Sequence, residues 1–485
     1  MDLSALADRL TGILPADGLI TDPVQLRTYE CDGLAQYTVT PGLVVLPEST
    51  EQVAACVRMC ARAGIPFVAR GSGTGLSGGA LPRADGVLIV TSRMRTVREV
   101  DLPAQRAVVD PGVINLQLSR QTLPDGYYFA PDPSSQLVCS IGGNVAENSG
   151  GAHCLKYGFT AGHITGMTWV APDGAVHRLG GKAPDSPGYD LLGVLVGSEG
   201  TLGIATEVTV KLTRSPQAVR TLLAAFSSIE AAGDAVSDVI GAGVVPAAIE
   251  MMDALAISAA EAATHCNYPA GAAAVLIVEL DGPAPQVEAE FADIERMCHS
   301  RGAFEIRIAA DDAERALFWK GRKSAFAAVG RISPDYIVQD GVIPRSKLAE
   351  VLAQIDDLAR AHDVRVANVF HAGDGNLHPL VLFDGAIEGA AERAEDVAGK
   401  ILELCLAHGG SITGEHGVGS DKAPFMAQMF TADDLDTMQL VRCALDPDGI
   451  ANPGKIFPTP RLCGERPGRG QGPHPLVVSG EAELF

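Results

Sequence analysis

The 485-residue sequence lacks an excess of positive charge, a long apolar run and closely paired cysteines. Its 37 Lys and Arg face 59 Asp and Glu, and the formal net charge of -22 argues against nucleic acid or an anionic membrane surface as a partner. Nowhere do about 18 apolar residues run together, and the first residues do not resemble a signal peptide. We therefore expect a cytoplasmic protein with no direct membrane insertion.

The ten cysteines include no C-x-x-C pair, the spacing common in redox and metal sites. Cys56 and Cys60 lie four apart on a predicted helix, where two thiols buried in the core are the simplest interpretation. The chain itself is therefore not expected to carry an iron–sulfur cluster.

The length exceeds the roughly 250 to 300 residues at which single hydrophobic cores stop growing, so we expect two large domains. Residues 38–214 are rich in short strands, and residues 217–457 alternate Ala-rich amphipathic helices with strands. Ser49 and Gln52 predict a capped start for a helix that ends at Gly64. The pattern predicts an α+β fold, preceded by a helical segment at 1–37 and followed by a poorly ordered tail at 458–485.

Glycine, at 54 residues, is abundant and gathers in discrete loops, of which 71–80 (GSGTGLSGGA) is the richest. It contains G-x-G-x-x-G after a predicted strand, but Pro82 and another strand follow where a dinucleotide-binding βαβ unit needs a helix. No Lys-Ser/Thr pair follows Gly79, so a P-loop is excluded as well. Two interpretations remain: a nest of backbone N–H groups around a pyrophosphate, or a sharp turn between strands.

Three further loops follow at 131–135 (PDPSS), 141–151 (IGGNVAENSGG) and 197–204 (GSEGTLGI). In this order, the four loops resemble the PCMH-type FAD-binding domain of the vanillyl-alcohol oxidase family over residues 38–214. The resemblance implies that the first loop wraps the pyrophosphate, the middle loops follow the ribityl chain and isoalloxazine, and the last supports the adenosine. The residues it places at the flavin are Arg70, Gly71, Ser72, Gly73, Thr74, Gly75, Gly78, Pro131, Asp132, Ser134, Gly142, Gly143, Asn148, Gly151, Gly162, Ile164, Glu199, Gly200, Gly203, Ile204 and Asn452.

Some relatives bind the flavin covalently through a histidine of the first loop. Thr74 occupies that position here, so the resemblance implies noncovalent FAD. His153 and His163, near the middle loops, are interpreted as ordinary polar residues.

Two histidine motifs lie in the second half of the chain. In the segment 371–378 (HAGDGNLH), a tight turn between two strands would place His371 and His378 at the mouth of one hairpin. The segment 413–419 (TGEHGVG) adds Glu415 and His416. Two imidazoles and a carboxylate suit a divalent ion such as zinc or manganese, and the histidine left over is a natural general base. The alternative is that both motifs are hydrogen-bonded loops without metal.

Residues 217–457 resemble the C-terminal domain of the FAD-linked oxidases, which include glycolate oxidase flavoprotein subunits, D-lactate dehydrogenases and D-2-hydroxyglutarate dehydrogenases. The resemblance implies an antiparallel sheet with helices, and it makes His371, His378 and Glu415 the metal ligands and His416 the catalytic base. It also implies that Arg322 holds the substrate carboxylate. The expected reaction transfers hydride from the α-carbon of a small D-2-hydroxy acid to flavin N5 and yields a 2-oxo acid.

A dicarboxylate substrate would need a second cation, because an unpaired buried charge is costly. Hydroxyglutarate relatives carry a lysine near a position where this chain has Val338. Glycolate or D-lactate is therefore the expected substrate. The alternatives are a D-2-hydroxyglutarate dehydrogenase and a non-redox flavoprotein that resembles alkylglycerone-phosphate synthase. The resemblance further implies a second flavoprotein and an iron–sulfur subunit as electron acceptors, which would hold this chain at the periphery of the inner membrane.

Overall fold

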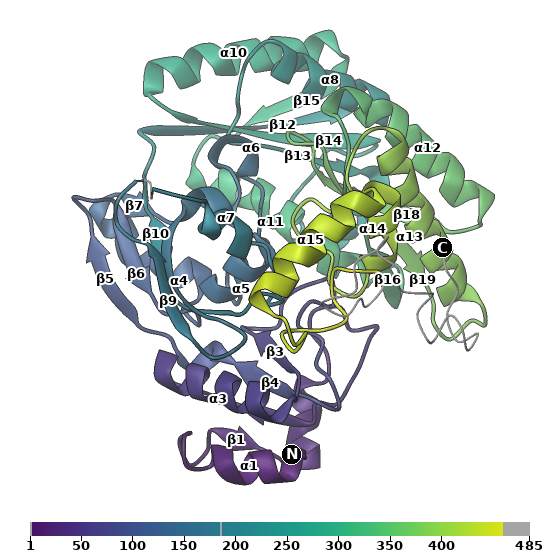
Figure 1. The fold of residues 1–485 in the computed structure, drawn as a ribbon. Coiled ribbons are helices and arrows are strands. Elements are labelled where there is room, and N and C mark those ends of the chain that lie inside the picture. The colour runs from purple at the N-terminus through teal and green to yellow at the C-terminus, as the bar shows by residue number, and fades with distance from the viewer. Residues whose placement is uncertain (1, 185–186, 459–485) are drawn as a thin grey trace.

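The computed structural model describes residues 2–184 and 187–458, which form an N-terminal and a C-terminal α+β part in contact with each other (Figure 1). The predicted α+β class is therefore confirmed. Within the described ranges, no helix combines the length and the apolar character needed to cross a bilayer. The sequence predicted a poorly ordered tail at 458–485. Residues from 459 onward lie outside the described part of the chain.

The first sheet of the N-terminal domain has the strand order β1-β2-β4-β3. Strands β2, β4 and β3 are parallel, and the connection from β3 to β4 contains no helix, as the sequence predicted. Helix α3 begins after Ser49, whose side chain accepts the N–H of Gln52, and ends at the left-handed Gly64. The bounds are β1 Leu19–Ile20, β2 Leu43–Val45, α3 Thr50–Ala63, β3 Phe67–Arg70 and β4 Val87–Val90.

Residues 2–37 are integrated into this domain, whereas the sequence suggested a separate helical segment. Strand β1 pairs with β2, and helix α1 (Leu3–Leu10) buries Leu6 and Leu10 in the core that α3 also lines. Beyond the short helix α2 (Pro23–Leu26), the carbonyl of Cys31 accepts a hydrogen bond from Arg70. The segment therefore packs on the start of the glycine loop.

The second sheet is antiparallel, with the order β5-β6-β10-β8-β9. Residues of α4, α5 and α7 share its apolar core. Helix α5 occupies the first part of the predicted loop 141–151, because the side chain of Ser140 caps it by accepting the N–H of Gly143. The bounds are β5 Val97–Asp101, β6 Arg106–Val109, α4 Asn115–Thr122, β7 Tyr127–Tyr128, α5 Ile141–Glu147, α6 Cys154–Tyr157, β8 Ile164–Val170, β9 Val176–Gly180, α7 Leu191–Leu195, β10 Ile204–Lys211 and β11 Thr213–Arg214.

The C-terminal domain is built on a larger antiparallel sheet with the order β15-β12-β14-β13-β18-β19-β16, in which β17 also pairs with β19. Helices α8, α10, α12 and α13 pack on one face, and α9 and α11 pack on the other. Both faces are buried, so the strands read as continuous apolar runs. The bounds are β12 Ala218–Phe226, α8 Ile229–Gly241, β13 Ala248–Asp253, α9 Ala254–Thr264, β14 Ala274–Gly282, α10 Ala284–Ser300, β15 Ala303–Ile308, α11 Asp312–Val329, β16 Asp335–Val338, β17 Gly341–Val342, α12 Leu348–Ala361, β18 Arg365–His371, β19 Asn376–Phe383 and α13 Ala390–Ala407.

The end of the described chain returns to the N-terminal domain. After α14 (Met426–Met429) and α15 (Ala432–Leu445), Ala451 forms a parallel bridge with Phe67, and the N–H of Asn452 donates to the carbonyl of Phe67 at 2.8 Å. Residues near 451 are therefore part of the first core, although the sequence assigned them to the C-terminal domain.

Ion pairs join the two domains beside helix α6. Nδ1 of His153 lies 2.7 Å from Asp132, and its Nε2 lies 3.3 Å from Glu279 on β14. Glu279 also accepts two hydrogen bonds from Arg315 on α11. Burial lowers the pKa of His153, but the two carboxylates outweigh it and raise the pKa to about 10. His153 therefore carries a positive charge that links the two domains, whereas the sequence suggested only an ordinary polar residue.

We predict that His153→Gln destabilises the protein most at low pH. The pKa of His153 is higher in the folded chain than the unfolded value of about 6.5, so its contribution is complete below pH 6.5 and is lost as the pH rises toward 10. The difference in unfolding free energy between wild type and variant should therefore shrink across this range. The exposed His299 gives a matched control, His299→Gln, which makes the same change away from the domain boundary; a His153 effect that grows with pH would contradict the assignment.

Candidate active site

A cavity in the N-terminal domain is walled by the glycine-rich segments that the sequence singled out. At Gly142 an added Cβ would lie 2.6 Å from Cβ of Pro111, and the N–H of Gly142 donates to the carbonyl of Pro111, so a side chain has no room there. Glycines along the wall let a cofactor lie close to the main chain, and the lining therefore fits FAD. The predicted flavin residues that line this cavity are Arg70, Gly71, Gly142, Gly143, Gly200, Gly203 and Ile204.

The other predicted flavin residues lie outside the lining of this cavity. Asn148 accepts the N–H of Ala161 through its side chain, and the side-chain amide of Asn452 donates to the carbonyl oxygens of Gly79 and Glu199. Ser134 and Gly162 are exposed. A contact with the flavin stays a prediction for these residues and for Ser72, Gly73, Thr74, Gly75, Gly78, Pro131, Asp132, Gly151, Ile164 and Glu199.

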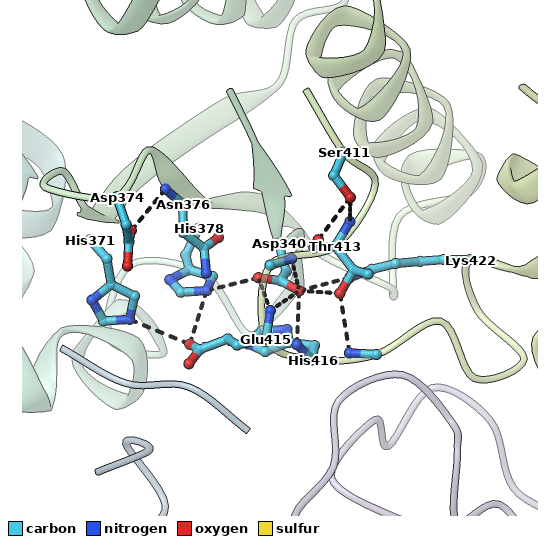
Figure 2. Close-up of polar contacts among 12 residues, drawn as sticks. Asp340, His371, Asp374, Asn376, His378, Ser411, Thr413, Glu415, His416 and Lys422 are labelled. Atoms are coloured by element: carbon cyan, nitrogen blue, oxygen red, sulfur yellow. Dashed lines mark hydrogen bonds and ion pairs between the residues drawn. The ribbon is translucent and has the colours of Figure 1, made fainter. Parts of the chain in front are cut away.

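The two histidines of the 371–378 motif lie on a β-hairpin. In the register of β18 and β19, His371 pairs with Asn376 and His378 pairs with Val369, so the turn falls between them as predicted. Glu415 comes from the distant second motif, and its Oε1 lies 3.3 Å from Nε2 of His371 and 3.3 Å from Nε2 of His378 (Figure 2). The fold therefore brings the three predicted metal ligands together.

The donor set of this cluster fits a divalent cation. One ligand atom from each of His371, His378 and Glu415 lies within 4.8 Å of the others, and all three residues are largely buried. Burial raises the pKa of Glu415, but the two imidazoles outweigh it and hold the pKa far below its usual range. The lone pairs of the two imidazoles and of the Glu415 carboxylate point toward one another. They would repel each other unless the rings are protonated or a cation lies between them.

His416 lies on the other side of His378. Their rings are stacked with centroids 5.0 Å apart, and Nε2 of His416 is 3.9 Å from Oε1 of Glu415. Its Nδ1 is buried and has no hydrogen-bond partner within residues 2–184 and 187–458. Burial is the main cause that lowers the pKa of His416 to about 4. The ring is therefore neutral near pH 7 and able to accept a proton.

The loop that carries Glu415 and His416 is wrapped around one carboxylate, that of Asp340. Its Oδ2 accepts hydrogen bonds from the N–H groups of Gly414 (3.0 Å) and His416 (2.9 Å) and from the hydroxyl of Thr413 (2.6 Å) (Figure 2). Lys422 lies 3.3 Å from the same oxygen. Burial raises the pKa of Asp340, but His416, when it is protonated at acidic pH, and Lys422 outweigh it and hold the pKa well below its usual range. Asp340 is therefore an ionised anchor for the loop.

A second buried carboxylate, Glu250 on β13, links His371 to Arg322. Its Oε1 lies 2.7 Å from Nδ1 of His371, and its Oε2 lies 2.6 Å from Nη2 of Arg322 on α11. This contact favours a proton on Nδ1 and leaves Nε2 of His371 as the ligand atom. Nε of Arg322 is buried, and the described part of the chain offers it no hydrogen-bond partner. Arg322, predicted to hold the substrate carboxylate, thus has one part of its guanidinium bound and another unsatisfied.

The site lies where the two domains meet. An added Cβ at Gly150, in the N-terminal domain, would lie 2.7 Å from Oε2 of Glu415. Sequence reasoning missed Asp340, Lys422 and Glu250, because each is a single charged residue outside the motifs: Asp340 and Glu250 lie far from them in sequence, and Lys422 follows Gly419 by three residues. The only available signal was the charge itself within apolar surroundings, as at Glu250 in the segment 247–252 (AAIEMM).

Two known families match the chain. Residues 41–180 match an FAD binding domain, and residues 215–456 match the C-terminal domain of the FAD linked oxidases. The glycolate oxidase subunit GlcD of Escherichia coli strain K12 is 51% identical over 96% of this chain and 92% of that protein. A D-lactate dehydrogenase of Anaerostipes hadrus is 31% identical over 93% of this chain and 97% of that protein.

Solved structures with low sequence identity share the fold. The structure of p-cresol methylhydroxylase superposes with a TM-score of 0.76 and 17% identity, over 93% of this chain and 96% of that one. An alkyldihydroxyacetonephosphate synthase superposes with a TM-score of 0.74 and 19% identity, over 93% of this chain and 86% of that one. The PCMH-type fold is thus confirmed, and together with the sequence matches it shows that the chain belongs to the FAD-linked oxidases and is an FAD-dependent oxidoreductase.

Proposed function

We propose that this protein oxidises glycolate or D-lactate to the corresponding 2-oxo acid. The observation that carries the proposal is the convergence of His371, His378 and Glu415 with the neutral His416 beside them. The names of the similar proteins, a glycolate oxidase subunit and a D-lactate dehydrogenase, support the same substrate class.

Two features of the chain favour a small substrate. Val338, on β16, pairs with Leu380 of β19 and offers no positive charge to a second carboxylate. The histidine cluster is also enclosed, with His371 4% and His378 1% exposed. Because an unpaired buried carboxylate costs several kcal/mol, a monocarboxylate is preferred over a dicarboxylate.

The side chains divide the work of binding and proton transfer. Arg322 would hold the substrate carboxylate, because its buried Nε still needs an acceptor. His371, His378 and Glu415 would hold a zinc or manganese ion, with the ring of His371 oriented by Glu250. When bound, FAD would supply the acceptor for the hydride of the α-carbon, and the metal ion would supply positive charge to the hydroxyl.

His416 would accept the proton of the substrate hydroxyl as the general base. Its ring is neutral near pH 7, and Asp340 holds its backbone N–H in place. The enclosure of the site keeps water away from the proton transfer.

Electrons would leave the reduced protein for partner proteins. The name of the Escherichia coli relative describes a subunit, which supports a complex in which a second flavoprotein and an iron–sulfur subunit accept electrons. Such partners would place this chain in the cytoplasm, at the periphery of the inner membrane.

The substrate is tested by steady-state turnover with an artificial dye as electron acceptor. Glycolate and D-lactate should give the largest kcat/KM among 2-hydroxy acids of both enantiomers, because Val338 offers no positive charge to a second carboxylate. A clear preference for D-2-hydroxyglutarate would reject this substrate assignment.

Replacement of His416 by alanine should leave the FAD content unchanged, because no flavin-cavity residue is removed. It should slow flavin reduction at least about a hundredfold, the lower end for loss of a general base. Stopped-flow absorbance measures that rate, with His299→Ala on the exposed face of α10 as the control. A near-normal rate in His416→Ala would remove His416 from the chemistry.

Alanine at His371 or His378 should abolish bound metal and turnover together, since each ring supplies one of only two imidazole ligands. Metal is measured by elemental analysis of the purified protein, and FAD by its absorbance. If either variant loses turnover while it keeps its metal, or loses metal while it keeps turnover, the two properties are not coupled as proposed.

A further inference from the structure

The segment from Thr413 to Lys422 is held from both domains. Its first half hydrogen-bonds to Asp340 of the C-terminal domain, as described above. In its second half, the N–H groups of Val418 and Gly419 donate to the two carboxylate oxygens of Glu199, at 2.7 and 2.6 Å. Glu199 belongs to the N-terminal domain and lies more than 200 residues away in sequence. The Glu199 carboxylate therefore ties the loop that carries His416 to the flavin-binding domain, together with the carbonyl of Ser77, which accepts the N–H groups of Ser420 and Asp421.

The glycines of the 413–419 motif make this approach possible. Gly417 has φ of 84° and Gly419 has φ of 53°, a region that side chains rarely adopt. An added Cβ at Gly417 would lie 2.9 Å from Oε1 of Glu199, and one at Gly419 would collide with the carbonyl of Ser77. Both positions thus require glycine because the loop backbone lies directly against the N-terminal domain.

Glu199 occupies an unfavourable environment for its residue type. Its φ is 51°, in the left-handed region, and its side chain is nearly completely buried. The main chain around it is fixed, since its N–H donates to the carbonyl of Ala146 and its own carbonyl accepts from Asn452 at 2.6 Å. Burial raises the pKa of the Glu199 carboxyl, and the hydrogen bonds from the N–H groups of Val418 and Gly419 oppose that shift.

We propose that Glu199 is a positioning residue that sets the place of His416 relative to the flavin-binding domain, by accepting the N–H groups of Val418 and Gly419. His416 lies two residues before Val418, so a shift of this anchor moves the base directly. The inference rests on the proposed role of His416. It gives Glu199 a role in addition to the flavin contact that the sequence predicted for the loop 197–204.

Replacement of Glu199 by glutamine tests the proposal. The amide keeps the shape but places an NH2 group against one of the two donors. We expect flavin reduction by glycolate to slow roughly tenfold to a hundredfold, the scale of a small misplacement of a catalytic group, with FAD content retained. The control is Glu99→Gln, which removes a carboxylate from the same domain where Glu99 is exposed and pairs with Lys182.

A double-mutant cycle with His416→Ala separates positioning from a general structural role. If Glu199 acts through His416, Glu199→Gln should change the rate less than about threefold once His416 is absent. An equal loss in both backgrounds, or no loss in the wild-type background, would overturn the proposal.

Amide hydrogen exchange gives a readout that does not depend on activity. In the FAD-bound wild type, the amides of Val418 and Gly419 should exchange slowly, and in Glu199→Gln at least one should exchange faster. Rapid exchange of both amides in the wild type would overturn the proposal, even if the variant fails to fold. If the wild type is not reduced by any 2-hydroxy acid, the proposed function fails, while the exchange result still decides whether Glu199 anchors the loop.

Discussion

The buried carboxylate of Asp340 is the interaction on which the site depends. One of its oxygens accepts the N–H groups of Gly414 and His416 and the hydroxyl of Thr413, and it also faces Lys422. Removal of one partner of such a buried pair typically costs about 3 to 5 kcal/mol. Because Glu415 and His416 are consecutive, the same hydrogen bonds fix the proposed metal ligand and the proposed base in one geometry.

Neither domain contains the whole site. The histidines and Glu415 come from the C-terminal domain, the flavin cavity comes from the N-terminal domain, and Gly150 of that domain lies against Glu415. Hydrogen bonds and ion pairs across the boundary, through Glu199 and His153, hold the two parts in register. These charged contacts fix the position of one domain relative to the other. Hydride transfer needs this, because substrate and flavin must lie at a defined separation.

Local patterns predicted the parts of this structure that depend on neighbouring residues. The hairpin that carries His371 and His378 follows from two apolar strands around a glycine turn, and the helix between Ser49 and Gly64 follows from its caps. Glu250 and Asp340 could not be found in this way, because their partners lie 121 and 76 residues away. The bridge between Ala451 and Phe67 could not be predicted for the same reason, because it depends on tertiary packing rather than on local propensity.

The most direct test of the account is anaerobic bleaching of the flavin absorbance by glycolate or D-lactate, before and after removal of metal with EDTA. The account predicts rapid bleaching by the metal-containing protein, its loss after chelation, and its return when zinc or manganese is added back. Equally fast bleaching in the metal-free protein, or no bleaching by any 2-hydroxy acid despite bound FAD, would contradict the central claim that metal, base and flavin act together at the domain interface.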